Sequence, residues 1–276
     1  MISINLTTTH SRLDLCSATL WSLIHQSLLP ERINLWISYT PFMADKGIIS
    51  LPNWINELNY IHDIIRVHYV DNTGPYRKVI PALRSATDED IIVYVDDDVI
   101  YASTWFEGLV NTFEKFERKY VVASRVRVKK YNFLRKRQSY NMFRICSKQQ
   151  LFFSDFIITG VGGCILMRKH IKEEFLDLND YRELIPKTDD IWISKIIELS
   201  NSQVYCNPLL LSFVQEIEHT NNALNQTNNT MYTGALLQKI YLKARNKILG
   251  YLGKPLSNND KSIEIVDSFF ESRADK

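Results

Sequence analysis

The sequence predicts an α/β fold, with a mostly parallel, doubly wound sheet and a helical C-terminal extension. Short apolar stretches of strand length alternate with segments whose apolar residues recur at helical spacing, as in βαβ units. The 276 residues are 45% hydrophobic and 12% aromatic, which is enough for a sizeable core. In such sheets ligands bind at the carboxyl ends of the strands, so the loops that follow the strands are candidate sites.

The predicted elements follow one another along the chain. We predict strands over 2–7, 33–38, 64–70, 91–95 and 120–126, and helices over 54–62, 77–87, 104–117, 189–200 and 231–251. A further helix begins just after Ser11, which forms a capping box with Asp14. Leu13, Cys16 and Leu20 then recur at helical spacing.

Polar loops at 8–12, 71–78 and 96–98 follow three of the strands, so we expect them to converge on one edge of the sheet. We expect a catalytic domain over 1–220 and then, over 221–276, a loop and a helical extension. Within the catalytic domain, the sequence suggests a nucleotide half at about 1–100 and an acceptor half at about 101–220. His219 and the Asn-rich stretch 221–230 are interpreted as loop residues.

Three adjacent aspartates, Asp96, Asp97 and Asp98, follow the apolar stretch IIVYV. A solvated strand end or a helix cap would explain one of them. Adjacent carboxylates raise one another's pKa unless a cation neutralises them, and Mn²⁺ or Mg²⁺ takes oxygen ligands of this kind. If the strand continues, Asp96 and Asp98 point to the same side. We therefore predict that Asp98 and Asp96 bind the metal, and that Asp96 and Asp97 lie beside a nucleotide.

Four motifs in order give the chain a family resemblance. They are TTTHSR after the first strand, GPYRKVIPAL before the aspartates, and GVGGCIL and KTDDIWIS after them. With the aspartates, they resemble the metal-dependent, nucleotide-sugar glycosyltransferases of the glycosyltransferase A fold, in particular inverting, family-2-like bacterial members that build surface glycans. The resemblance covers roughly residues 2–200.

The resemblance implies a nucleotide-diphosphate sugar as donor, with a UDP-sugar preferred. Thr8, Thr9, Arg12 and Lys78 would then hold the nucleotide. Arg12 lies near a helix N-terminus, which attracts anions, but it could instead pair with a surface carboxylate. For Lys78 the alternative is a solvated helix face.

The resemblance places the motifs GVGGCIL and KTDDIWIS at the acceptor site. By resemblance, Gly162 and Gly163 border the acceptor sugar, although a tight bend in a strand would also need glycine. Asp190 matches the general base of the inverting members, and Asp189 would support it. Acids in a first helical turn are also favoured by the helix dipole alone. Many members have Glu at the position of Asp189, which leaves its role open.

Basic residues are concentrated in one segment. Residues 118–154 contain eleven Lys or Arg and no acid, which leaves 22 basic and 31 acidic residues elsewhere, a net charge of −9. The segment could bind nucleic acid, an anionic glycolipid or a membrane surface, or it could be a solvated loop. No nucleic-acid fold signature accompanies it. We therefore expect an anionic glycan or glycolipid acceptor, such as a surface polysaccharide or lipooligosaccharide, and no nucleic acid.

Two other functions stay open at this point. A nucleotidyltransferase that makes nucleotide sugars also combines an α/β fold with acidic metal ligands, but TTTHSR lacks the glycines of its phosphate loop. A non-enzymatic protein could bind nucleic acid or membranes through the basic segment.

The sequence shows neither a signal peptide nor the roughly 20 apolar residues of a membrane span. The four cysteines, Cys16, Cys146, Cys164 and Cys206, form no CxxC pair and are expected to be free thiols. We therefore expect a cytoplasmic protein, with peripheral contact at the inner face of the cytoplasmic membrane.

Overall fold

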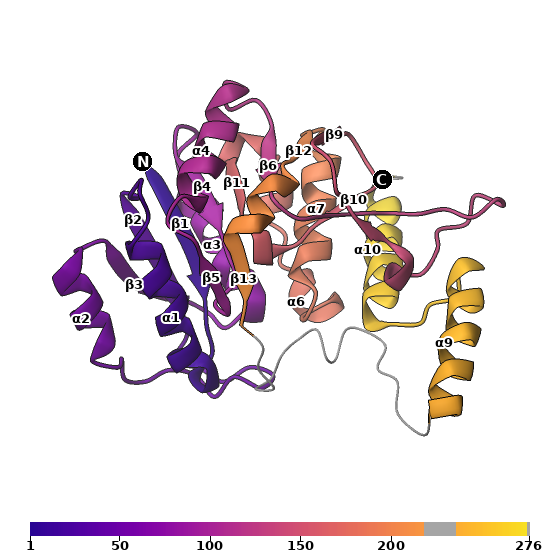
Figure 1. Ribbon diagram of the computed structural model, residues 1–276, viewed down its shortest axis with the longest axis horizontal. Helices are drawn as coiled ribbons and strands as arrows, with labels where there is room; N and C mark the ends of the chain where they lie inside the picture. Colours follow the sequence, from indigo (N-terminus) through magenta and orange to yellow (C-terminus); the bar gives the residue numbers. More distant parts are fainter. Residues whose placement is uncertain (218–235, 275–276) are drawn as a thin grey trace.

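A computed structural model describes residues 1–217 and 236–274, with side chains described for 1–217 and 242–273. Its centre is an eight-stranded sheet with helices on both faces (Figure 1). The strands are β1 (Ile2–Thr7), β2 (Arg32–Ile37), β3 (Ile65–Tyr69), β4 (Ile91–Tyr94), β6 (Val121–Ala123), β9 (Gln150–Phe152), β11 (Cys164–Met167) and β12 (Val204–Cys206).

The strand order along the sheet is β3-β2-β1-β4-β11-β6-β12-β9. β1 pairs in parallel with β2 and β4, β2 with β3, and β6 with β12. Only β11 and β9 run against their neighbours in this sheet. The predicted α/β fold with a mostly parallel sheet is therefore confirmed.

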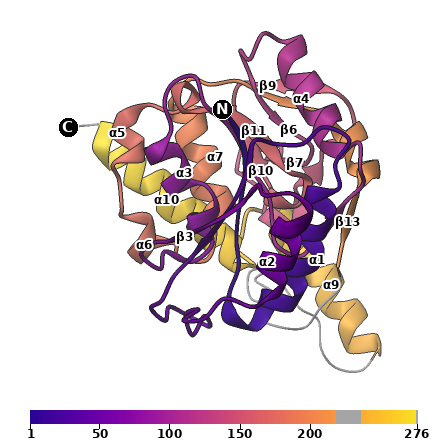
Figure 2. The same ribbon diagram turned by 90° about the vertical axis from the view of Figure 1, so that its left-hand side faces the viewer.

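Two apolar clusters hold the helices against the sheet. The helices are α1 (Leu13–Ile24), α2 (Trp54–Ile61), α3 (Ile80–Ser85), α4 (Trp105–Lys115), α5 (Glu173–Leu176), α6 (Tyr181–Leu184), α7 (Asp189–Leu199), α9 (Leu236–Tyr251) and α10 (Asn258–Ala274). Ile91 and Val93 of β4 belong to one cluster, with α1, α2 and α4, whereas Ile92 and Tyr94 belong to the other, with α3, α7 and α10 (Figure 2). Alternate residues of one buried strand thus face opposite helical layers.

Smaller elements complete the fold. They are β5 (Val99–Tyr101), which pairs with β13 (Val214–Glu216), and β7 (Val126–Val128), which pairs with β8 (Arg144–Ile145) and β10 (Phe156–Ile158). Short 3₁₀ turns include η1 (His10–Arg12), η2 (Gly74–Lys78), η3 (Tyr140–Met142) and η4 (Gly160–Gly162). All four cysteines are buried free thiols, as expected.

The structure corrects three local predictions. The capping box at Ser11 is absent, because η1 runs directly into α1 and no side chain caps that helix. The helix predicted over 77–87 is replaced by η2 and the short α3, since Pro81 in the first turn of α3 lacks the N–H needed to continue a preceding helix. The strand predicted over 120–126 is divided between β6 and β7, which belong to different sheets.

The C-terminal part is helical, as predicted. The helix expected over 231–251 is described from Leu236 and ends at Tyr251, while His219 and the stretch 221–230 lie outside the described residues. α10 packs on α7, where Trp192 contacts Phe269 and Phe270. None of the described helices is both long and apolar enough to span a membrane.

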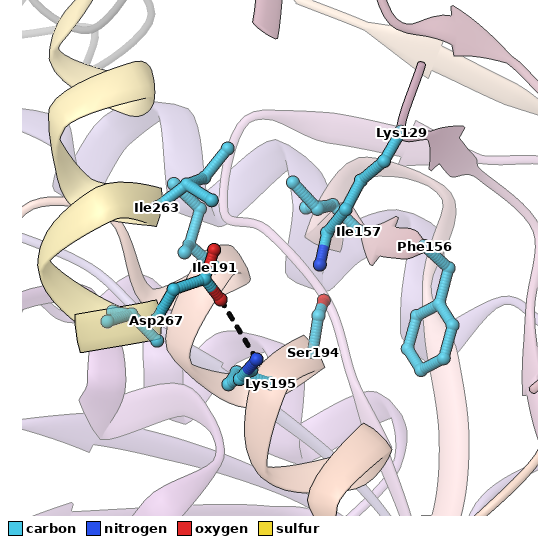
Figure 3. Close-up of a pocket in the computed structure, with 9 residues that line it drawn as sticks. Lys129, Phe156, Ile157, Ile191, Ser194, Lys195, Ile263 and Asp267 are labelled. Carbon is cyan, nitrogen blue, oxygen red and sulfur yellow. Dashed lines mark hydrogen bonds and ion pairs between the residues drawn. The ribbon is translucent and has the colours of Figure 1, made fainter. Parts of the chain in front are cut away.

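A small cavity lies at the contact between α7 and α10 (Figure 3). Lys129, Ser194, Lys195 and Asp267 line it together with apolar side chains, and Lys195 pairs with Asp267 at 2.9 Å. Its volume of about 10 Å³ suits about one water molecule. It is too small to hold a sugar.

Candidate active site

The strand order explains why the polar motifs meet. β1 lies between β2 and β4, so the loops that follow these three parallel strands emerge at the same edge. The loop after β1 carries Arg12, and the loop after β4 carries Asp96 to Asp98. Lys78, at the end of η2, forms ion pairs with Asp96 and with Asp189 in the first turn of α7, so α7 also meets this edge.

Arg12 neutralises two of the three adjacent aspartates. Its Nη2 atom pairs with Asp97 and lies 2.9 Å from Asp98 Oδ2. Because β4 ends at Tyr94, the aspartates lie in a loop and the strand alternation predicted for them does not apply. Asp97 is buried, and burial raises its pKa to about 6 against the opposing effect of Arg12.

Lys78 joins the loop after β4 to helix α7. Its Nζ atom lies 2.7 Å from Asp96 Oδ1 and 2.8 Å from Asp189 Oδ2. The side chain is buried, so the alternative of a solvated helix face is wrong. Burial alone would lower the pKa of Lys78, but Asp189 and Asp96 outweigh it and raise that pKa well above its usual value. Lys78 therefore carries its charge between the two carboxylates.

Asp190 lies beside this ion pair with a perturbed carboxyl group. Burial raises its pKa well above the usual value and Asp189 adds to the shift, while Lys78 and a backbone hydrogen bond from Gly160 oppose it. Its Oδ1 atom has no hydrogen-bond partner among the described residues. A carboxylate with a raised pKa and an unbonded oxygen is suited to accept a proton near neutral pH.

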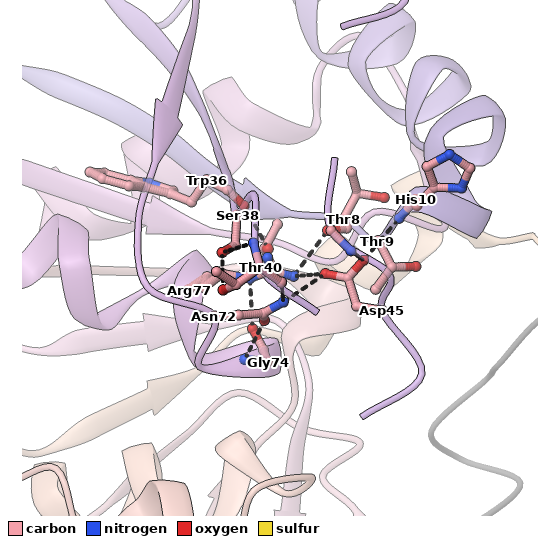
Figure 4. Close-up of polar contacts among 12 residues, drawn as sticks. Thr8, Thr9, His10, Trp36, Ser38, Thr40, Asp45, Asn72, Gly74 and Arg77 are labelled. Carbon is pink, nitrogen blue, oxygen red and sulfur yellow. Dashed lines mark hydrogen bonds and ion pairs between the residues drawn. The ribbon is translucent and has the colours of Figure 1, made fainter. Parts of the chain in front are cut away.

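A second polar cluster lies around the loop after β1 (Figure 4). Arg77 Nη2 donates to Asp45 Oδ2 at 3.0 Å and to the Thr8 carbonyl at 3.1 Å. Asn72 also donates to Asp45 Oδ2, at 3.1 Å, and the backbone N–H of His10 donates to Asp45 Oδ1 at 3.2 Å. Asp45 thus ties the loops after β1, β2 and β3 together.

Sequence reasoning missed Asp45, and Arg77 was not among the residues predicted to hold the nucleotide. The available signal was position: Asp45 lies in the loop after β2, and the carboxyl end of β2 adjoins that of β1. Gly47 two residues later has a φ of +80°, which marks a turn. Thr8 is buried beside this cluster, whereas Thr9 is partly exposed at the start of η1.

The glycine motif meets the carboxylates through Gly160. A Cβ atom at Gly160 would collide with Asp96 Oδ1 and lie 2.9 Å from Lys78 Nζ. Gly162 packs against Ser124, and Gly163, with a φ of +77°, packs against the Trp105 ring. The role of Gly162 and Gly163 at the acceptor therefore stays a prediction, while their observed contacts are internal packing.

The three aspartates fit a divalent cation that is shared with a substrate. Asp96 and Asp98 offer hard oxygen atoms, and their side chains are 25% and 24% exposed. No group of three or more His, Cys, Asp or Glu within residues 1–217 and 236–274 could hold a metal ion alone. Ions such as Mg²⁺ are often held by one or two carboxylates plus substrate phosphates. A cation here would need phosphate oxygens to complete its coordination.

Residues 51–176 match the model of a family described as glycosyl transferase family 2. The matched segment contains η2, the three aspartates and the glycine motif, and it ends before α7. The match covers less than half of the chain. Together with the sheet, it supports a glycosyltransferase of the glycosyltransferase A fold, in line with the motifs. Among curated proteins, no sequence matches the chain.

The fold is similar to several solved structures. S. aureus TarS 1–349 in complex with UDP-GlcNAc is 14% identical with a TM-score of 0.49, and the similarity covers 98% of this chain and 71% of that one. A second structure of S. aureus TarS is 13% identical with a TM-score of 0.43, over 74% of this chain and 34% of that one. The chain thus spans about a third of that protein's length.

The 4-diphosphocytidyl-2C-methyl-D-erythritol synthase from Anaerococcus prevotii DSM 20548 is also similar. It is 13% identical with a TM-score of 0.45, over 90% of this chain and 96% of that one. At such identities and scores, these similarities decide neither the substrate nor the reaction.

Proposed function

We propose that the protein is an inverting glycosyltransferase that moves a sugar from a nucleotide diphosphate, with UDP preferred, to a glycan or glycolipid acceptor. The contact that carries this proposal is the double ion pair of Lys78 with Asp96 and Asp189. Through this one lysine, Asp96 of the predicted nucleotide side is linked to α7, the helix that bears Asp190. A donor phosphate and an acceptor hydroxyl could therefore meet between them.

Asp190 is the proposed general base. It would take the proton from the acceptor hydroxyl as the oxygen attacks the anomeric carbon of the donor sugar. The new carbon–oxygen bond forms on the face opposite the diphosphate, and the old bond breaks with its electron pair leaving on the diphosphate. The configuration at that carbon is inverted.

The nucleotide would lie against the loop after β1. Thr8, Thr9 and Arg12 come from that loop, and the Asp45–Arg77 pair fixes its shape through the Thr8 carbonyl. Lys78 would hold Asp96 and Asp189 in place beside the diphosphate. Arg77 Nη1, which is buried without a hydrogen-bond partner among the described residues, is a further donor at this edge.

Asp96 and Asp98 are the proposed ligands of Mn²⁺ or Mg²⁺. Such an ion would offset the negative charge that develops on the leaving diphosphate. The acceptor would approach from the side of Gly162 and Gly163. We place the reaction in the cytoplasm, at the inner face of the membrane, on a bacterial surface polysaccharide or lipooligosaccharide.

A donor screen tests this proposal. The protein is incubated with a panel of nucleotide sugars, with and without Mn²⁺, and free nucleoside diphosphate is measured. We expect release from at least one UDP-sugar, and the loss of that release in Asp98→Ala and Asp190→Ala. Full activity in both variants would contradict the mechanism. Release of pyrophosphate from a nucleoside triphosphate and a sugar phosphate would instead identify a nucleotidyltransferase.

A further inference from the structure

Helix α9 lies at the end of the molecule opposite α2 (Figure 1). Residues 130–137, which form the turn of a hairpin, and residues 242–254, at the end of α9 and just beyond it, make up what we call the hairpin–α9 surface. Its exposed large apolar side chains are Tyr131, Phe133, Leu134, Ile248, Tyr251 and Leu252. Phe133 and Ile248 are 76% and 62% exposed, and exposed apolar side chains that are grouped rather than scattered singly mark interaction surfaces.

The hairpin turn has a defined structure. Asn132 is buried, and its Oδ1 atom accepts hydrogen bonds from the backbone N–H groups of Leu134 and Lys136 at 2.9 and 3.0 Å. The backbone N–H of Asn132 donates to the Lys136 carbonyl at 2.9 Å. These bonds hold the turn closed while the side chains of Phe133 and Leu134 point to solvent.

The turn is fixed to the end of α9. Asn132 Nδ2 donates to the Tyr251 carbonyl at 3.1 Å, and the Ser139 N–H donates to the Gly250 carbonyl at 2.9 Å. Asp260 of α10 secures the same junction by accepting hydrogen bonds from Ser139 Oγ and from the N–H of Tyr140. The two apolar groups therefore form one surface, although they are far apart in the sequence.

The surface is strongly basic. Residues 130–137 and 242–254, which form it, contain no Asp or Glu. Arg137 is paired with Asp267 of α10, so its charge is already neutralised within the protein. The cations of the surface that make no ion pair within the described part of the chain are Lys130, Arg135, Lys136, Arg245, Lys247 and Lys254.

We infer that the hairpin–α9 surface docks on an anionic lipid bilayer. Exposed aliphatic and aromatic side chains on a basic surface would enter the headgroup region, while the cations interact with anionic lipids. Single-stranded nucleic acid fits less well, because its binding surfaces use aromatic side chains as stacking platforms and gain little from Leu134, Ile248 or Leu252. The site that binds lipid is separate from the aspartates of the active site.

The consequence for catalysis rests on the proposed function. An enzyme held on a membrane by this surface would meet acceptors that are linked to lipid. The docking itself needs no donor sugar and no turnover, so the two ideas can fail independently.

Vesicle sedimentation tests the docking. The full chain is mixed with vesicles of phosphatidylcholine alone or of phosphatidylcholine with phosphatidylglycerol. We expect binding only to the anionic vesicles, weakened by salt. Arg135→Gln with Lys136→Gln should weaken it by more than about tenfold, since each cation near the surface contributes about fivefold. Phe133→Ser with Leu134→Ser should weaken it by about tenfold or more.

Matched controls lie elsewhere on the molecule. Lys115→Gln removes an exposed cation of α4, and Tyr60→Ser removes a side chain of α2 that is 94% exposed; both should bind vesicles like the wild type. Equal binding to the two vesicle types, no binding, or salt-sensitive binding of an RNA oligonucleotide without vesicle binding would overturn the inference. Donor turnover is measured in parallel without vesicles, and its absence would contradict only the proposed function.

Discussion

Two cations, the partly buried Arg12 and the buried Lys78, neutralise the acidic edge of the sheet in different ways. Arg12 pairs with Asp97 and Asp98, which are neighbours in one loop. Lys78 pairs with Asp96 and Asp189, which come from the loop after β4 and from α7. Arg12 therefore joins the loop after β1 to the loop after β4, whereas Lys78 joins the loop after β4 to α7, the two sides of the proposed reaction. We therefore expect a change at Arg12 to affect mainly the stability of the fold, and a change at Lys78 to affect mainly the geometry of the proposed reaction.

The largest loss of turnover is expected for a change of Asp190, the proposed general base beside Lys78. Asp190→Asn keeps the size of the side chain but removes its ability to accept a proton. The turnover number should fall by about 10²- to 10⁴-fold, the usual contribution of a general base. Nucleotide binding, measured by calorimetry with the nucleoside diphosphate, should be unchanged. Asp97→Asn, on the Arg12 side, should lose far less turnover, and an equal loss would remove the distinction between the two sides.

A smaller effect is expected where Gly160 touches the Lys78 ion pair. The methyl group of Gly160→Ala would collide with Asp96 Oδ1 and press on Lys78 Nζ. Because both atoms end flexible side chains, the ion pair should shift while the fold stays intact. We expect roughly a tenfold loss of turnover at an unchanged melting temperature. Gly108→Ala adds the same methyl group on α4, beside Leu210, and should retain full turnover.

The smallest expected effect is on the pH dependence of folding stability, and it arises from Asp97, which pairs with Arg12. The folded protein keeps a proton on Asp97 up to a pH of about 6, whereas the unfolded chain releases it near 3.8. The folded state thus binds more protons between these values, and this group makes stability fall as pH rises from about 4 to 6. Urea unfolding in a chelating buffer should show a weaker fall for Asp97→Asn. Identical slopes in wild type and variant would contradict a buried, protonated Asp97.

Much of the fold could be predicted from the sequence, because the strands that form the sheet are short, apolar and separated by amphipathic helices. The prediction failed where local signals compete: Ser11 and Asp14 looked like a capping box, but Ser11 lies in a 3₁₀ turn and Asp14 in the first turn of α1. α10 was not predicted as a separate helix, although Ser257 and Asp260 form its capping signal, with Asp260 Oδ2 accepting from Ser257 N–H.

For the candidate site, the sequence indicated which motifs matter but not their contacts. Asp96, Asp189 and Lys78 were each predicted from separate motifs, and no pattern in the chain shows that one lysine would pair with both acids. Asp45 was missed because it belongs to no motif and is placed only by the packing of three loops. Tertiary ion pairs of this kind depend on the strand order, which the sequence does not state.

The pH dependence of turnover tests the role of Lys78 most directly. Activity needs deprotonated Asp190, so it should fall at acid pH, with a midpoint above the usual carboxyl range. Lys78 lowers the pKa of Asp190, whereas Arg12 pairs with Asp97 and Asp98, so Lys78→Met should move that midpoint to higher pH while Arg12→Met leaves it in place. An unmoved midpoint in Lys78→Met, or an equal shift in both variants, would contradict the account.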